Sequence, residues 1–138
     1  MPYSLSFRER LDYDAGQLGI TVPVVLSLGY ESVKVLAKVD TGAENCIFQR
    51  EYGEELGIAI ETGVPKQFRT ATGSFLTYGH EVTVSSTGYE FNAMVYFSFD
   101  YNFIRNVLGR QGWLEQMRLG IVHYDGQIYA SRYDEDPL

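Results

Sequence analysis

The residues of this sequence best suited to chemistry lie in segment 38–48, which contains the triplet Asp40-Thr41-Gly42. An acidic residue at the end of a strand, followed by a small hydroxyl residue and a glycine, predicts a tight loop. Such a loop can present the Asp40 carboxylate to a cleft, where it can take part in acid–base chemistry, while backbone N–H groups support its charge. Gly42 would permit a turn with positive φ and the close approach of another backbone. Taken alone, the triplet also fits an ordinary strand-to-turn corner, because all three residue types are common in turns.

The other residues that could bind a metal or act as nucleophiles are few and scattered. His80 and His123 are isolated in the sequence, and Cys46 does not complete an obvious ligand set with them. A cysteine nucleophile would need a histidine nearby in space, and no local residue supplies one. Cys46 precedes the apolar pair Ile47-Phe48, which favours a small buried residue. We therefore expect no metal ion and no cofactor.

The elements that must position Asp40 begin with a strand directly before it. Residues 32–39 alternate with a period of two, which indicates a strand and not a helix. The apolar, β-branched run 21–28 predicts a preceding strand, joined to the first by a hairpin turn at Gly29-Tyr30. The face of segment 32–39 expected to be buried carries Val33, Val35, Ala37 and Val39.

Further strands are expected after Asp40. Residues 65–71 and 75–86 read as two strands around a hairpin tip at Thr72-Gly73-Ser74. Residues 91–99 alternate cleanly between apolar and other side chains, which predicts another strand. The remaining expected elements are a helix over 50–56 ended by Gly57, a helix over 111–119 ended by Gly120, and a hairpin over 122–130 around Asp125-Gly126.

Length and composition favour a single, mainly β domain. The chain has 138 residues, of which 45% are hydrophobic and 14% aromatic, and aromatic residues favour half-buried strands. We expect one domain spanning residues 1–138, with a core at about 21–130 and a flexible acidic tail at 131–138. Many short strands with one or two short helices point to an all-β barrel or sandwich.

The charge of the chain argues against two classes of partner. The net charge is -7, whereas binding to nucleic acid or to an anionic membrane surface requires a basic face. The N-terminus lacks the long apolar stretch of a signal peptide, and no segment has the length and hydropathy of a membrane span. Cys46 is the single cysteine, which allows a reducing compartment. We therefore expect a cytoplasmic protein that binds neither nucleic acid nor membranes.

In three of its segments the sequence resembles the retropepsin family, the retroviral-type aspartic proteases. The family carries a hydrophobic residue followed by Asp-Thr-Gly-Ala/Ser at a strand end, as in segment 39–43 here. It then has a glycine-containing flap hairpin, which Ala71-Thr72-Gly73-Ser74 resembles. A hydrophobic-hydrophobic-Gly loop follows, which Val107-Leu108-Gly109 resembles. The three features occur in the family's order, and the resemblance implies a closed β-barrel of the acid protease type.

The resemblance also implies a mechanism that needs two copies of the chain. Aspartic proteolysis uses two carboxylates, but only one Asp-Thr-Gly is present, so Asp40 would meet its symmetry mate across the twofold axis of a homodimer. The pair would share a proton: the ionised partner activates a water, and the protonated partner polarises the peptide carbonyl. The expected activity is therefore that of an aspartic endopeptidase on peptide or protein substrates.

The resemblance assigns roles to the other residues of the three segments. Thr41 would reach across the dimer, Gly42 would let the loop turn, and Ala43 cannot donate the hydrogen bond to the aspartate that a serine could, so we expect a mildly acidic optimum. Gly73, between Thr72 and Ser74, would let the flap close over a peptide.

One competing function stays open. A retropepsin fold can also serve as a peptide-binding or dimerisation module that has lost proteolysis or barely retains it, because a fold does not guarantee its usual activity. The intact Asp40-Thr41-Gly42 favours the enzyme, since a scaffold would not need that acid.

Overall fold

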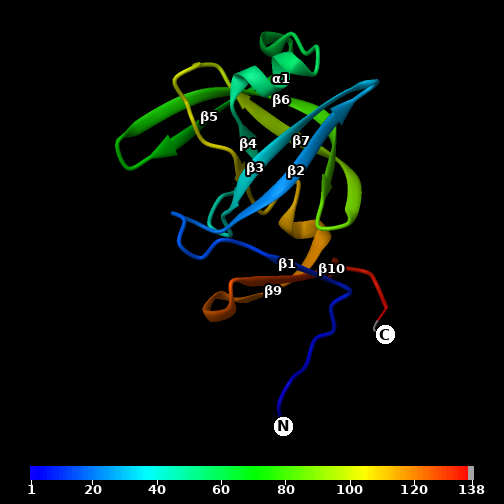
Figure 1. Cartoon of the computed structure of the whole chain (residues 1–138). Helices are drawn as coiled ribbons and strands as arrows, with labels where there is room; N and C mark the ends of the chain where they lie inside the picture. The colour runs from blue at the N-terminus through cyan, green and yellow to red at the C-terminus, as the bar shows by residue number, and fades with distance from the viewer. Residues whose placement is uncertain (137–138) are drawn as a thin grey trace.

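Strands dominate the computed structural model, which describes residues 1–136 (Figure 1). Seven strands form one sheet in the order β2-β3-β8-β4-β7-β6-β5, and an additional β2–β6 pairing closes it into a barrel. A second sheet has the order β1-β10-β9. The strands are β1 (Glu9–Asp12), β2 (Thr21–Leu28), β3 (Glu31–Val39), β4 (Ile47–Phe48), β5 (Val64–Thr70), β6 (Gly73–Ser86), β7 (Tyr89–Ser98), β8 (Val107–Leu108), β9 (Met117–Val122) and β10 (Gln127–Arg132). The predicted all-β class is confirmed.

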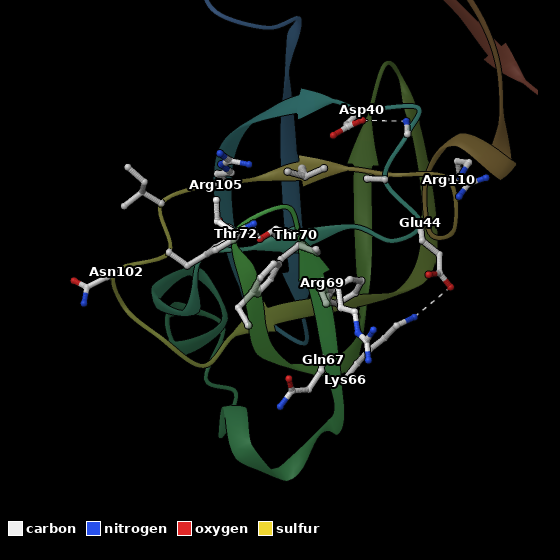
Figure 2. Close-up of a pocket in the computed structure, with 18 residues that line it drawn as sticks. Asp40, Glu44, Lys66, Gln67, Arg69, Thr70, Thr72, Asn102, Arg105 and Arg110 are labelled. Carbon is white, nitrogen blue, oxygen red and sulfur yellow. Dashed lines mark hydrogen bonds and ion pairs between the residues drawn. The ribbon is translucent and has the colours of Figure 1, made fainter.

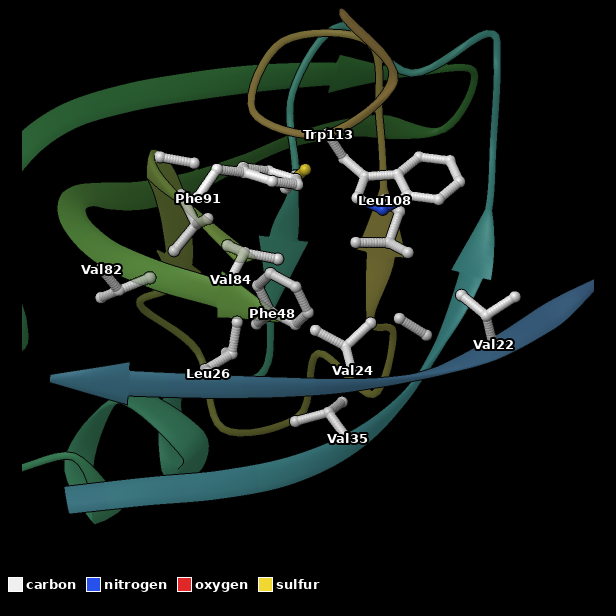
Figure 3. Close-up of a cluster of buried hydrophobic side chains, with 14 of the residues drawn as sticks. Val22, Val24, Leu26, Val35, Phe48, Val82, Val84, Phe91, Leu108 and Trp113 are labelled. Atoms are coloured by element: carbon white, nitrogen blue, oxygen red, sulfur yellow. The ribbon is translucent and has the colours of Figure 1, made fainter. Parts of the chain in front are cut away.

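The β2–β3 hairpin forms as the alternating pattern predicts. Val24 pairs with Val35 in its antiparallel register, and Gly29 adopts a φ of 60° at the turn. Alternate apolar side chains of both strands face the barrel interior, where burying a Val or Leu contributes roughly 1.5–3 kcal/mol, whereas Leu36 on the other face is exposed. Figure 3 shows the interior side chains in one cluster with Phe48, Val84 and Trp113, all of which are fully buried.

The flap-like hairpin β5–β6 turns slightly earlier than expected. Thr70 pairs with Gly73, so the turn itself consists of Ala71 and Thr72. Gly73 and Ser74, which the sequence placed at the tip, are the first residues of β6. Gly73 has a φ of 155°, a conformation that side chains disfavour.

The predicted helix over 111–119 is wrong, whereas the earlier one is confirmed. Helix α1 spans Arg50–Glu55, and Gly57 ends its C-terminal turn with a φ of 82°. Within segment 111–119 only a 3₁₀ turn, η2 (Leu114–Gln116), forms. Gly112 has a φ of 95° that a helix cannot accommodate, and the residues after the turn pair as β9 with β10. Non-local strand pairing therefore overrides the local helical pattern.

The small sheet lies against one end of the barrel, where the N-terminal segment extends away (Figure 1). The β9–β10 hairpin was predicted with a two-residue turn, but its loop has four residues: the 3₁₀ turn η3 (His123–Asp125) and Gly126. The third 3₁₀ turn, η1 (Ile60–Thr62), follows α1. No helix within residues 1–136 has the length and apolar character needed to cross a membrane.

The segment expected to be an acidic tail is partly ordered by specific contacts. Ser131 and Arg132 complete β10, and Glu135 forms an ion pair with Arg8 and accepts a hydrogen bond from the Tyr89 hydroxyl. Residues 131, 132 and 135 are thus bonded to the folded part of the chain, beyond the core expected at about 21–130. The last part of the predicted tail, residues 137–138, lies outside the described residues.

Candidate functional site

Asp40 directly follows β3, whose end pairs with β8 in parallel. Val39 pairs with Leu108, and the backbone N–H of Asp40 donates to the Leu108 carbonyl at 3.0 Å. This pairing brings the second glycine loop beside the Asp40 loop. Two of the three predicted site segments, 67 residues apart between Asp40 and Val107, are therefore one structural unit.

The Asp40 loop is a tight turn, as its sequence predicted, but Gly42 does not adopt the positive φ that was expected to make glycine necessary there. The N–H of Gly42 donates to Asp40 Oδ1 at 3.0 Å, and the N–H of Ala43 donates to the Asp40 carbonyl at 3.1 Å. The first bond holds the carboxylate in one orientation and stabilises its negative charge. Asp40 is half-buried, whereas Thr41 and Gly42 are exposed. The loop thus presents an oriented carboxylate at an accessible surface.

Gly109 marks the point where the two loops cross. A Cβ atom on Gly109 would lie 2.2 Å from the Asn45 carbonyl oxygen, so only glycine fits there. Two backbone hydrogen bonds follow the crossing: the Arg110 N–H donates to Ala43 O at 2.9 Å, and the Gln111 N–H donates to Glu44 O at 2.8 Å. The crossing fixes the position of the Asp40 loop relative to the barrel.

Cys46 supports this crossing from inside the barrel. Its sulfur accepts a hydrogen bond from the Gly109 N–H at 3.4 Å, and burial raises the pKa of the thiol to about 12. A thiol with such a pKa is neutral and inert near pH 7. The prediction of a small buried residue at Cys46 is therefore confirmed.

A cleft of about 810 Å³ opens above Asp40 (Figure 2). Its floor includes Asp40, Gly42 and Ala43, and the β5–β6 hairpin and the segment between β7 and β8 form its walls. Of the other predicted site residues, Thr72 and Val107 line the cleft. The residues that do not line it, within the described chain, are Thr41, Gly73, Ser74, Leu108 and Gly109. Leu108 and Gly109 are buried and act as support behind the floor.

Residues 102–105 form a wall of the cleft that could not be predicted from the sequence. This segment has no alternating pattern, so nothing in its local sequence indicated a position beside Asp40. In the structure the ring of Phe103 stacks on Phe75 with centroids 4.7 Å apart, which joins the wall to strand β6. Arg105 from the same segment also lines the cleft.

Lys66 was missed as well, although it joins the hairpin to the Asp40 loop. Its ammonium donates to Asn45 Oδ1 at 2.8 Å, lies 3.3 Å from Glu44 Oε1 and sits over the rings of Phe68 and Tyr96. The base of the hairpin is thereby tied to the loop that carries Asp40. The sequence around Lys66 predicted a strand, but it did not indicate which side chains of that strand lie at the site.

The chemistry available at this site is that of a carboxylate. Within residues 1–136, no group of three or more His, Cys, Asp or Glu side chains is arranged to hold a metal ion. The acids that line the cleft are Asp40 and Glu44, and Glu44 is engaged by Lys66. Asp40 lines the cleft, is oriented by the Gly42 N–H, and is the acid that can exchange a proton with a bound molecule.

Comparison with known proteins places these features in a family. A family model described as aspartyl protease matches residues 22–121. The chain is similar to a retropepsin-like aspartic protease from Rickettsia conorii, with 21% identity and a TM-score of 0.57 over 80% of this chain and 89% of that one. It is also similar to EIAV protease complexed with the inhibitor HBY-793, with 17% identity and a TM-score of 0.53 over 72% and 88% of the two chains. No curated protein matches the chain. The structural likenesses show the retropepsin fold.

Proposed function

Because the chain belongs to the retropepsin-like aspartyl protease family, we propose that it is an endopeptidase in which Asp40 is the catalytic carboxylate. The observation that carries this proposal is the position of Asp40. Its side chain is oriented by the Gly42 N–H, lies on the floor of a cleft and faces a hairpin that can cover a bound peptide. Val107 and the buried Gly109 act as supports of this floor.

The proposed working unit is a homodimer. Aspartic proteolysis needs two carboxylates, and the second acid of the cleft, Glu44, is held by Lys66. A twofold axis beside Asp40 would bring a second Asp40 to the first without any further residue. Thr41 is exposed next to Asp40, where a hydroxyl can reach the partner's loop. Each protomer then contributes half of one active site.

In the proposed mechanism the two Asp40 carboxylates share one proton, because two adjacent carboxylates resist simultaneous ionisation. The ionised Asp40 removes a proton from a water molecule, which attacks the carbonyl carbon of the peptide. The protonated Asp40 of the partner subunit donates to the carbonyl oxygen. Collapse of the tetrahedral intermediate transfers a proton to the leaving nitrogen, and the pair returns to its starting state.

The β5–β6 hairpin is the proposed flap. Its turn at Ala71-Thr72 stands over the cleft, and its strands can offer main-chain hydrogen bonds to an extended peptide. Closing the hairpin would exclude water from the reacting groups, which strengthens their electrostatic interactions. We further propose a cytoplasmic location, since the single, buried Cys46 suits a reducing compartment.

The proposal is tested by comparing the wild type with Asp40→Asn on a diverse peptide library between about pH 4 and 7, a range that brackets the shared-proton state. We expect cleavage by the wild type with an optimum in the mildly acidic part of the range. Asp40→Asn should lose activity by at least roughly 10²–10⁴-fold, the contribution of general acid–base catalysis. Thermal unfolding should confirm that the variant is folded. No cleavage by either folded protein would instead identify a peptide-binding module.

A further inference from the structure

The cleft above Asp40 has the opposite charge to the rest of the protein. The chain contains 11 Lys and Arg against 18 Asp and Glu, which gives its net charge of -7. The cleft nevertheless has four basic residues and two acidic ones in its lining, a local balance of 4 − 2 = +2. Its basic residues are Lys66, Arg69, Arg105 and Arg110, and its acidic residues are Asp40 and Glu44. An acidic protein thus concentrates positive charge at its candidate active site.

The arginines of the cleft differ from the other arginines in their bonding. Outside the cleft, every arginine is engaged by a carboxylate or by backbone carbonyls. These are Arg8 with Glu135, Arg10 with Asp12, Arg50 with Glu54 and Glu61, Arg132 with Asp134, and Arg118 with the carbonyls of Ser6, Tyr133 and Glu135. Within residues 1–136, the guanidinium groups of Arg69, Arg105 and Arg110 make no hydrogen bond or ion pair. Their donors remain available to a ligand.

The pairing of Lys66 leaves this positive balance to the arginines. Because its ammonium is paired with Glu44 and fixed over Phe68 and Tyr96, that pair contributes little net charge to the cleft. What remains is the carboxylate of Asp40 among three unpaired guanidinium groups. A cleft lined by one sign of charge attracts ligands of the opposite sign and raises their local concentration.

The three arginines come from different segments that surround Asp40. Arg69 is on the flap strand β5, Arg105 precedes β8, and Arg110 follows Gly109. Figure 2 shows Arg105 and Arg110 on opposite sides of Asp40, with Arg69 on the hairpin side. A peptide crossing the cleft would therefore pass a guanidinium group on both sides of the bond above Asp40.

We propose that this cleft selects peptides with aspartate or glutamate on either side of the scissile bond, with Arg69, Arg105 and Arg110 as the specificity-determining residues. Guanidinium groups bind carboxylates through paired hydrogen bonds. The cleavage of such peptides rests on the proposed function, whereas their preferential binding does not. A nucleic acid is disfavoured as the ligand because its phosphate chain would extend beyond the cleft onto an acidic surface.

The test uses matched octapeptide pools that contain either Asp and Glu or Asn and Gln at the positions flanking a fixed central dipeptide. At about pH 6 and low salt the side-chain carboxylates are ionised. We expect the wild type to favour the acidic pool roughly tenfold in kcat/KM, mainly through KM. Arg69→Gln, Arg105→Gln and Arg110→Gln should each reduce this ratio about twofold, as expected for exposed charge pairs, and the triple variant should abolish it. Lys34→Gln removes one positive charge from β3 outside this cleft and should leave the ratio unchanged.

Binding of the same pools to Asp40→Asn, measured by fluorescence anisotropy, separates the two proposals. Preference for the acidic pool without any cleavage by the wild type would retain this inference and overturn proteolysis. Cleavage by the wild type with equal rates on both pools would retain proteolysis and overturn this inference. Tighter binding of a single-stranded oligonucleotide than of the acidic pool would overturn the choice of a peptide ligand. Raising the salt concentration should weaken the preference, because salt screens exposed charges.

Discussion

At the scale of single residues, the site depends on glycines as well as on Asp40 itself, because a side chain at Gly109 would disturb the loop that carries the acid. The N–H of Gly42 orients Asp40. The loop that holds this N–H can pack closely against segment 107–110 because Gly109 has no side chain to collide with the Asn45 carbonyl. The carboxylate could be recognised from the sequence because the residues around it form a local pattern. The three unpaired arginines could not, since their common position depends on contacts between distant segments.

Gly109→Ala should destabilise the protein by about 2–3 kcal/mol, the cost of forcing an atom into a packed site. The new Cβ would lie 2.2 Å from the Asn45 carbonyl oxygen, and a backbone atom cannot move aside cheaply. Urea unfolding near neutral pH measures the change. The matched control is Gly73→Ala, where no atom lies within 4 Å and only the φ of 155° is unfavourable. We expect the control to lose about 1 kcal/mol or less. Equal losses in both variants would contradict the close crossing at Gly109.

At the scale of elements, the flap and the wall opposite it are coupled by aromatic packing. Phe75 on β6 stacks with Phe103 in the segment between β7 and β8, and Phe68 on β5 stacks with Phe75 at a centroid distance of 5.6 Å. This chain of rings connects both flap strands to the cleft wall. Movement of the flap therefore requires the Phe75–Phe103 contact to change.

Phe103→Ala should loosen the flap without unfolding the barrel. Loss of an aromatic pair worth about 0.5–1.5 kcal/mol corresponds to a KM increase of roughly 2–10-fold. Hydrogen exchange of the amides in the β5–β6 hairpin gives a second readout that does not depend on activity, and it should become faster. Tyr124→Ala, which removes an exposed ring from the β9–β10 loop, should change neither quantity. Unaltered exchange in Phe103→Ala would show that the rings do not restrain the hairpin.

Some elements of the fold could be predicted from the sequence and others could not, because only some of them depend on local sequence patterns. The β2–β3 hairpin has a local signal, because both strands alternate and Gly29 supplies the turn. Segment 111–119 has a local pattern that favours a helix. Its last residues, from Met117, instead pair with β10 as the start of strand β9. The closure of the barrel through β2–β6 has no local signal, since its partners lie far apart in the chain.

At the scale of the whole molecule, the two ends of the chain are joined by a polar cluster centred on Glu135. The hydrogen bond from the Tyr89 hydroxyl lowers the pKa of Glu135, and the Arg132 N–H and Arg8 lower it further. Burial and the same contact raise the pKa of Tyr89. The ionised carboxylate thus stabilises the association of segment 133–136 with Arg8, which precedes β1, and with Tyr89 on β7.

Glu135→Gln should lower the melting temperature near pH 7, where the wild-type carboxylate is ionised. A depressed carboxyl pKa stabilises the fold fully above the unfolded pKa, near 4.3, and this contribution is lost as the pH falls through the folded pKa. The difference between variant and wild type should therefore shrink steadily below about pH 4. Asp136→Asn, whose side chain makes no hydrogen bond or ion pair within residues 1–136, is the control and should melt like the wild type. A difference that does not depend on pH would argue against a role for the charge.

The proposed sharing of one active site between two protomers is tested most directly by mixing wild-type protein with excess Asp40→Asn. Both chains should be incubated long enough to exchange partners and then assayed with peptide in large excess. If each site needs one Asp40 from each protomer, an equal amount of the variant should reduce wild-type activity to about one half, and a nine-fold excess to about one tenth, by random pairing. Activity that is unaffected by the variant at every ratio would contradict the shared site and assign catalysis to a single chain.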